Sequence, residues 1–153
     1  MFFLKAGGGL LLAYLTLYLQ GKILPESIPH PDGFLILVVY YGVTRTQIPA
    51  TMMGTVAGLA EDSLSWPFGI HAFTKTTIGY IVSGLGSRFL LNQPVPQFLI
   101  LLVGTIVEVG LQRIVLAMIG QGLVWPSPGA LILQGLINAV TGVALFRFVD
   151  RFL

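Results

Sequence analysis

Cysteine is absent from this 153-residue chain, and charged residues make up only 9% of it. The lack of cysteine excludes disulfides, thiolate metal sites and cysteine nucleophiles, although it does not report the redox compartment. An ordinary soluble domain has roughly 25% charged residues. Because 55% of the residues are hydrophobic, the composition indicates an integral membrane protein in contact with the lipid bilayer.

Recognisable sites for chemistry are also lacking. The formal net charge is only +2 and the basic residues are scattered, so nucleic-acid binding is not expected. His30 and His71 belong to no HExxH pattern, which leaves a metal site unsupported. There is no phosphate-binding glycine loop or nucleophile elbow. We therefore expect no catalytic residues, no cofactor and no enzymatic activity.

Long apolar segments fill most of the chain. They do not alternate polar and apolar residues as a membrane barrel does, so helices are expected. The length allows about six spans of roughly 20 residues in one domain. We place the spans at about 4–24, 33–46, 49–64, 69–91, 96–120 and 128–148. The first continues without a small-residue cleavage site, so we interpret it as a retained span rather than a signal peptide.

The second segment is short. A dozen residues make about 18 Å of helix, against roughly 30 Å of hydrocarbon. The Arg45 side chain can extend to the membrane surface, the membrane can be locally thin, or the segment can span only partially. We favour a short complete span. The prolines before it predict an exposed loop that carries His30 and Asp32. At the other end, Ser127 is expected to cap the last span, and residues 146–153 to form an amphipathic surface tail.

The basic residues predict the orientation. With six spans, only Lys22 flanks one side of the membrane. The other side has Lys5, Arg45, Arg88, Arg147 and Arg151. The positive-inside rule then places both termini in the cytoplasm of a multi-pass inner-membrane protein.

Residues 54–80 are predicted to form a closely packed hairpin. Gly54 and Gly58 form a GxxxG pair that lets a neighbouring backbone approach. Asp62 continues the same helix face. Gly69 allows a tight entry into the next span, on which Gly79 repeats a small-residue packing face. We expect these five residues to form a helix-packing surface or a partner interface.

Ionisable residues inside spans need partners, because an unpaired charge there costs several kcal/mol. Lys75 is the natural partner of Asp62 or Glu61, which point about 100° apart and should differ in their contacts. The acids could instead face water at the membrane boundary, or relay protons. Glu108 and Arg113 are five residues apart, so each should have a partner on another helix. We favour structural ion pairs over catalysis.

The run Gly54, Gly58, Leu59 and Asp62, followed by residues 66–69 and then Gly79 and Tyr80, resembles the signature hairpin of the rod shape-determining protein MreD family. Length, six spans and cytoplasmic termini agree with the resemblance. Glu61 and Lys75 depart from that signature.

The resemblance implies a non-enzymatic subunit of the bacterial cell-elongation complex, a scaffold that binds MreC and supports peptidoglycan synthesis and cell shape. Through MreC it would connect to MreB, RodA and a class B penicillin-binding protein. The family is also similar in architecture to the substrate-binding subunits of energy-coupling-factor transporters. A vitamin or other small-ligand binding subunit is therefore an alternative, and a proton-linked transporter is disfavoured because repeated halves are lacking.

Overall fold

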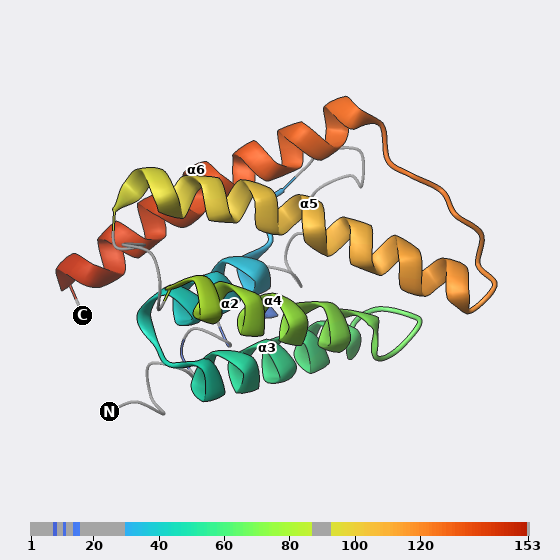
Figure 1. Ribbon diagram of the computed structural model, residues 1–153, viewed down its shortest axis with the longest axis horizontal. Helices are drawn as coiled ribbons and strands as arrows, with labels where there is room; N and C mark the ends of the chain where they lie inside the picture. The colour runs from blue at the N-terminus through green and yellow to red at the C-terminus, as the bar shows by residue number, and fades with distance from the viewer. Residues whose placement is uncertain (1–7, 9–10, 12–13, 16–29, 87–92, 153) are drawn as a thin grey trace.

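The described residues of the computed structural model form an all-helical fold (Figure 1), as the composition predicts. The structure describes residues 8, 11, 14–15, 30–86 and 93–152, so the predicted span 4–24 lies almost wholly outside them. The helices are α2 (Gly33–Thr44), α3 (Gln47–Asp62), α4 (Ile70–Gly86), α5 (Pro94–Met118) and α6 (Pro128–Phe152).

Two antiparallel helix pairs are held together by α2. In Figure 1, α5 runs beside α6 and α3 runs beside α4. The helix α2 contacts all four of them. Because its sequence GFLILVVYYGVT is apolar on every side, α2 is stable only where protein or lipid excludes water, and here the other helices bury most of its residues. This short helix is therefore the centre of the fold.

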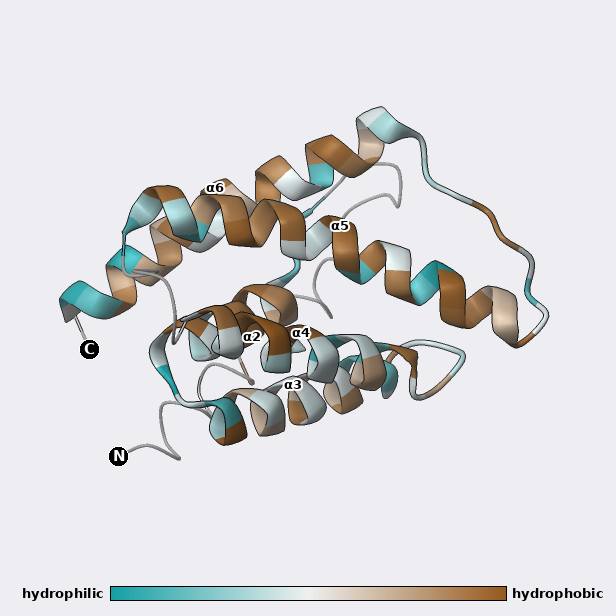
Figure 2. Ribbon diagram, in the orientation of Figure 1, coloured by the Kyte–Doolittle hydropathy of each residue, from teal (hydrophilic) through white to brown (hydrophobic). Residues whose placement is uncertain are grey.

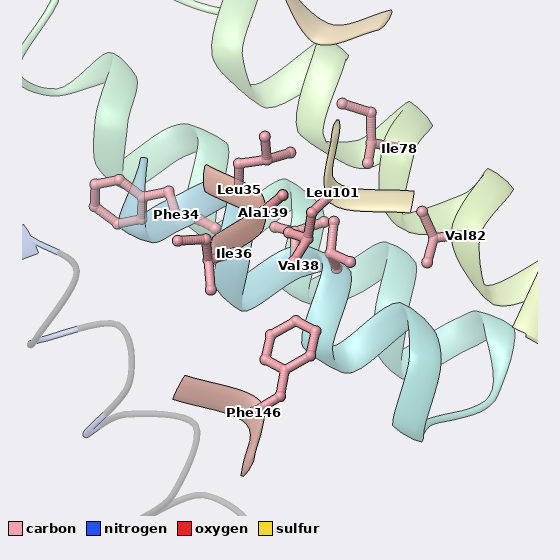
Figure 3. Close-up of a cluster of buried hydrophobic side chains, with 11 residues drawn as sticks. Phe34, Leu35, Ile36, Val38, Ile78, Val82, Leu101, Ala139 and Phe146 are labelled. Carbon is pink, nitrogen blue, oxygen red and sulfur yellow. The ribbon is translucent and has the colours of Figure 1, made fainter. Parts of the chain in front are cut away.

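The hydrophobic core surrounds α2 (Figure 3). Phe34, Leu35 and Val38 of α2 are fully buried. Side chains from the four other described helices complete the cluster: Ala57, Ile78, Val82, Leu101, Ala139 and Phe146. The core thus joins both helix pairs, and it positions the N-terminal end of α2 beside α4 and α5.

The start of α2 corrects one expectation. Asp32 does not lie in an exposed loop but caps the helix, since its side chain accepts a hydrogen bond from the Leu35 N–H at 2.9 Å. Ser127 caps α6 as predicted, accepting from the Ala130 N–H at 3.3 Å. The helix α5 begins at Pro94, two residues before the predicted start, because a proline fits the first turn of a helix.

The C-terminal residues also differ from expectation. The predicted amphipathic tail is the continuation of α6, which is helical to Phe152. Its last turns keep contact with the rest of the chain, because the Tyr40 hydroxyl of α2 donates to the Asp150 carboxylate at 3.3 Å. The end of α6 therefore lies beside the second half of α2.

Glycines let α3 and α4 approach each other closely. A Cβ at Gly54 would overlap the backbone at Lys75, and one at Gly58 would overlap the backbone at Ala72. A Cβ at Gly79 would lie 2.6 Å from the carbonyl oxygen of Ala50. These three glycines thus pack α3 against α4 within the chain, so a partner helix would need another surface.

Gly69 has a different role from the other glycines of the hairpin. It has a φ of +100° and open space around it, so it serves the turn into α4 rather than a helix contact.

Two described helices are long and apolar enough to cross a membrane: Pro94–Met118 and Pro128–Arg151. Figure 2 shows hydrophobic residues along most of α5 and α6. Many of their large apolar side chains are exposed, including Val103 and Val140. Exposed apolar surface of this extent is expected where lipid is the solvent. The fold is consistent with a membrane protein.

Candidate functional site

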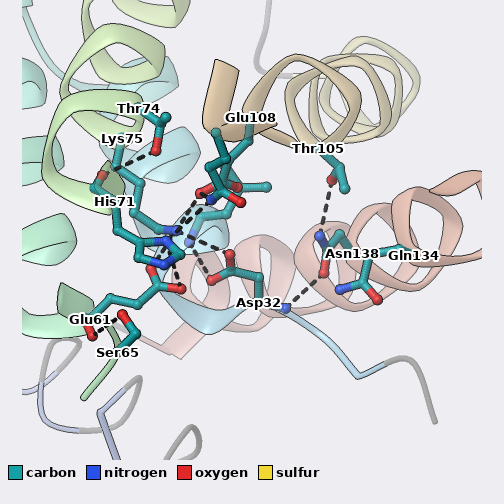
Figure 4. Close-up of polar contacts among 12 residues, drawn as sticks. Asp32, Glu61, Ser65, His71, Thr74, Lys75, Thr105, Glu108, Gln134 and Asn138 are labelled. Atoms are coloured by element: carbon teal, nitrogen blue, oxygen red, sulfur yellow. Dashed lines mark hydrogen bonds and ion pairs between the residues drawn. The ribbon is translucent and has the colours of Figure 1, made fainter. Parts of the chain in front are cut away.

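The Lys75 ammonium lies at the centre of a buried polar cluster (Figure 4). Lys75 lies in the second turn of α4 and is fully buried. The Nζ atom lies 3.1 Å from Asp32 Oδ2 and 2.5 Å from Glu61 Oε2, and it also contacts Glu108 Oε1. The three acids come from the start of α2, the end of α3 and the middle of α5. One lysine therefore joins four helices.

Acidic groups outnumber ammonium groups at this centre. Three carboxylates contact a single ammonium, and the Glu61 and Glu108 side chains are only 10% and 4% exposed. The Asp32 carboxylate also accepts a hydrogen bond from the Leu35 N–H at the start of α2. Burial raises the pKa of Asp32, but the Lys75 ammonium and the Leu35 N–H together bring that pKa below its ordinary value. Removing the ammonium would leave two buried glutamates and the partly buried Asp32 without their shared partner.

His71 and Gln112 cover the cluster on one side. The His71 Nδ1 atom lies 3.3 Å from Glu61 Oε1, and Gln112 Nε2 lies 3.2 Å from the same Nδ1. Gln112 also donates to Glu108 at 3.4 Å. Since His71 is four residues before Lys75, both side chains project from one face of α4.

Asp62 has a separate role from Glu61. Its two carboxylate oxygens accept hydrogen bonds from the backbone N–H groups of His71 and Ala72, at 3.0 and 2.9 Å. These donors belong to the first turn of α4, where the helix dipole favours a negative charge. Asp62 thus caps the next helix, whereas its neighbour Glu61 forms an ion pair with Lys75. The two neighbouring acids have different partners.

Two amide side chains of α6 connect this helix to the segment that carries Asp32. Asn138 accepts from the Asp32 backbone N–H at 2.7 Å and donates to Thr105 Oγ1 at 3.0 Å. Gln134, one turn earlier, donates to the carbonyl of His30 at 2.7 Å. His30 therefore contributes its backbone here. These contacts fix Asp32, which lies 43 residues before Lys75 in the sequence.

The structure brings together only part of the predicted polar set. Glu61, Lys75 and Glu108 meet, whereas Arg113 takes part in none of the ion pairs formed among the described residues. Asp32 was missed because its position among prolines suggests a solvated loop. Gln112, at four residues from Glu108, and Asn138 in an apolar helix were weak signals that could have indicated polar contacts inside the bundle.

The cluster contains possible metal donors. One ligand atom each from Glu61, His71 and Glu108 lies within 4.8 Å of the others. However, Lys75 already places a positive charge against both of these glutamates. The ammonium and a metal ion would compete for the same carboxylate oxygens, so we assign no metal site. The arrangement is typical of a buried ion-pair network that fixes one packing of its helices.

A comparison with protein families identifies the chain. The family model described as rod shape-determining protein MreD matches residues 9–152. The chain belongs to the MreD family. No curated protein and no solved structure showed significant similarity to it. The match confirms the resemblance noted in the sequence, and it supports a rod shape-determining membrane protein.

The MreD resemblance has a physical basis in the α3–α4 hairpin. Gly54 and Gly58 allow the backbone of α4 to approach, and Asp62 on the same face caps its first turn. Glu61 and Lys75 form an ion pair next to this contact. The hairpin and the cluster are therefore one continuous structural unit in this MreD protein.

Proposed function

We propose that this MreD protein is a non-enzymatic scaffold of the bacterial cell-elongation complex, and that it binds MreC in the inner membrane. The family match over residues 9–152 carries the proposal. In this role it supports peptidoglycan synthesis through MreC, with indirect contact to MreB, RodA and a class B penicillin-binding protein. The buried cluster then keeps the scaffold in a single packing, so that its outer faces are presented in a constant arrangement.

The proposed topology is a six-span bundle, of the kind found in energy-coupling-factor substrate-binding subunits, with both termini in the cytoplasm. Its support is that Arg45, Arg147 and Arg151 belong to one end of the fold. Figure 1 shows the start of α3, the start of α5 and the end of α6 at the same side. The Tyr40–Asp150 hydrogen bond links that end of α2 to α6. Basic residues gather on the cytoplasmic side of membrane proteins.

Because the chain has no cysteine, single cysteines can report this topology cleanly. Thr46→Cys, between α2 and α3, should react with a membrane-impermeant maleimide only after the cells are opened. Phe68→Cys, in the exposed turn between α3 and α4, should react in intact cells. The opposite labelling pattern would contradict the orientation.

The MreC interface is expected on an outer face, because α4 already covers the glycines of α3. A photoreactive residue can be placed singly at exposed positions of α3, α4, α5 and α6: Val56, Tyr80, Val103 and Val140. We expect cross-links to MreC from one face only, in cells whose rod shape the variants maintain. The fully buried Val38 is the matched control, which should give none.

No cross-link from any face, in variants that insert normally and maintain rod shape, would count against direct MreC binding.

The small-ligand alternative is less well supported, because the acids near the α3–α4 turn contact Lys75 and the backbone of α4. Each of these contacts occupies a group that a ligand would otherwise bind.

A further inference from the structure

A basic hollow lies between the beginning of α5 and the end of α6. It has a volume of about 380 Å³ and is lined by Gln97, Arg147, Asp150 and Arg151. Gln97 belongs to the first turns of α5, and the other three residues belong to the last turns of α6. We call this region the α5–α6 hollow. It is separate from the Lys75 cluster.

Two arginines dominate the charge of the α5–α6 hollow. Arg147 and Arg151 are four residues apart, so they project from the same side of α6. The acid between them, Asp150, accepts a hydrogen bond from Tyr40 of α2. Arg147 takes part in none of the ion pairs formed among the described residues. The hollow therefore presents a net positive charge.

The wall formed by α5 adds a polar group to the hollow. Gln97 is 5% exposed and supplies an amide at the surface of the hollow. The start of α5 offers few backbone donors, because Pro94 and Pro96 have no N–H group. The arginine pair itself is well suited to a phosphate group.

Exposed apolar side chains occur on both helices near the hollow. Phe148 follows Arg147 directly and is exposed. Val95, Leu99 and Leu145 are exposed on the outer faces of α5 and α6, about 160° round the helix from Gln97 and Arg147. A ligand with a phosphate in the hollow could therefore extend its acyl chains past Phe148 onto this outer apolar surface. The combination of a basic pocket between helices and adjacent apolar surface is the pattern by which membrane proteins bind anionic lipid headgroups.

We propose that the α5–α6 hollow binds the phosphate of an anionic phospholipid, held by Arg147 and Arg151. In the topology proposed above the hollow faces the cytoplasmic leaflet, whose anionic lipids would supply the ligand. The lipid site itself depends neither on that orientation nor on MreC binding, so its failure and the failure of the proposed function can be told apart.

The test uses the full chain in nanodiscs of phosphatidylcholine, with and without phosphatidylglycerol. Native mass spectrometry measures retained phosphatidylglycerol, and thermal unfolding measures the stabilisation that it gives. The double variant Arg147→Gln, Arg151→Gln should lose roughly 30-fold in phosphatidylglycerol affinity, since each arginine near an anionic surface contributes about 5-fold. Arg113→Gln, which removes an arginine elsewhere on α5, should keep the wild-type preference.

Equal retention of phosphatidylglycerol by the wild type and the double variant would overturn the proposal. A second arm adds inorganic phosphate to phosphatidylcholine nanodiscs. If phosphate alone stabilises the wild type as much as phosphatidylglycerol does, the hollow takes a free anion and the lipid assignment is wrong. The variant Arg147→Lys, Arg151→Lys keeps the charge, so it should retain more of the lipid preference than the glutamine variant.

Discussion

Replacing Lys75 with methionine should destabilise the protein strongly. Methionine is similar in length and flexible enough to fill the same space, so the change removes the charge with little loss of packing. In the Lys75→Met variant, Asp32, Glu61 and Glu108 would remain in the protein interior without the ammonium that all three contact. Buried carboxylates without a cation are costly, because neither water nor a counter-charge stabilises them.

The magnitude can be worked from the contacts. Removing one partner of a buried ion pair typically costs about 3–5 kcal/mol of unfolding free energy. Here one substitution removes the partner of three acids, although Asp32 keeps its hydrogen bond from Leu35. For a chain of this size 1 kcal/mol shifts the melting temperature by about 2–4 °C, so a decrease of roughly 6–20 °C is expected.

The assay is thermal unfolding of the purified protein in one detergent at one scan rate, followed by far-UV circular dichroism. Arg113→Met is the matched control, because it removes a basic residue outside the ion pairs of the described residues. Its effect should stay within about 0.5 kcal/mol. A triple variant, Lys75→Met with Glu61→Gln and Glu108→Gln, removes the excess negative charge and should recover most of the lost stability.

Two results would refute this reasoning. A melting temperature of Lys75→Met equal to that of the wild type would mean that the ammonium does not hold the acids. A triple variant as unstable as the single one would mean that the lysine acts through its packing, and the charge of Glu61 and Glu108 would then be irrelevant to stability.

Two further predictions concern the α3–α4 contact. Gly58→Leu should prevent correct packing of the hairpin, because the new side chain would overlap the backbone of α4, and limited proteolysis should show a loosened fold even without MreC. Asp62→Ala should cost about 2–4 kcal/mol, since two backbone N–H groups of α4 lose a charged acceptor. Asp62→Asn should cost less in the same unfolding assay, because an amide oxygen can still accept one of these bonds.

Controls separate these effects from general sensitivity to substitution. Gly110→Leu changes a glycine of α5 that has open space around it, so it should be tolerated. If Gly58→Leu is as resistant to proteolysis as Gly110→Leu, then α3 and α4 do not pack as described. If Asp62→Ala unfolds at the wild-type temperature, the capping of α4 contributes nothing measurable.

The sequence by itself determined the helices and the pattern within the α3–α4 hairpin. Apolar length and prolines predict where helices begin and end, because both act through the local backbone. The spacing of Gly54, Gly58 and Asp62 places them on one helix face. The turn between α3 and α4 is short, so the two helices are neighbours, and local geometry sufficed for the family resemblance. The sequence left open whether this glycine face meets α4 or a partner, and the structure shows that it meets α4.

Only the tertiary structure decided which acids surround Lys75. Periodicity shows the face on which a side chain lies, but not which distant helix covers that face. Glu108 lies 33 residues after Lys75, and Asp32 lies 43 residues before it. Their meeting depends on how α2 and α5 pack against α4 around the apolar core. An ion-pair network between distant segments is thus a consequence of packing, since each charge is stabilised only by whatever the assembled fold places within a few ångströms of it.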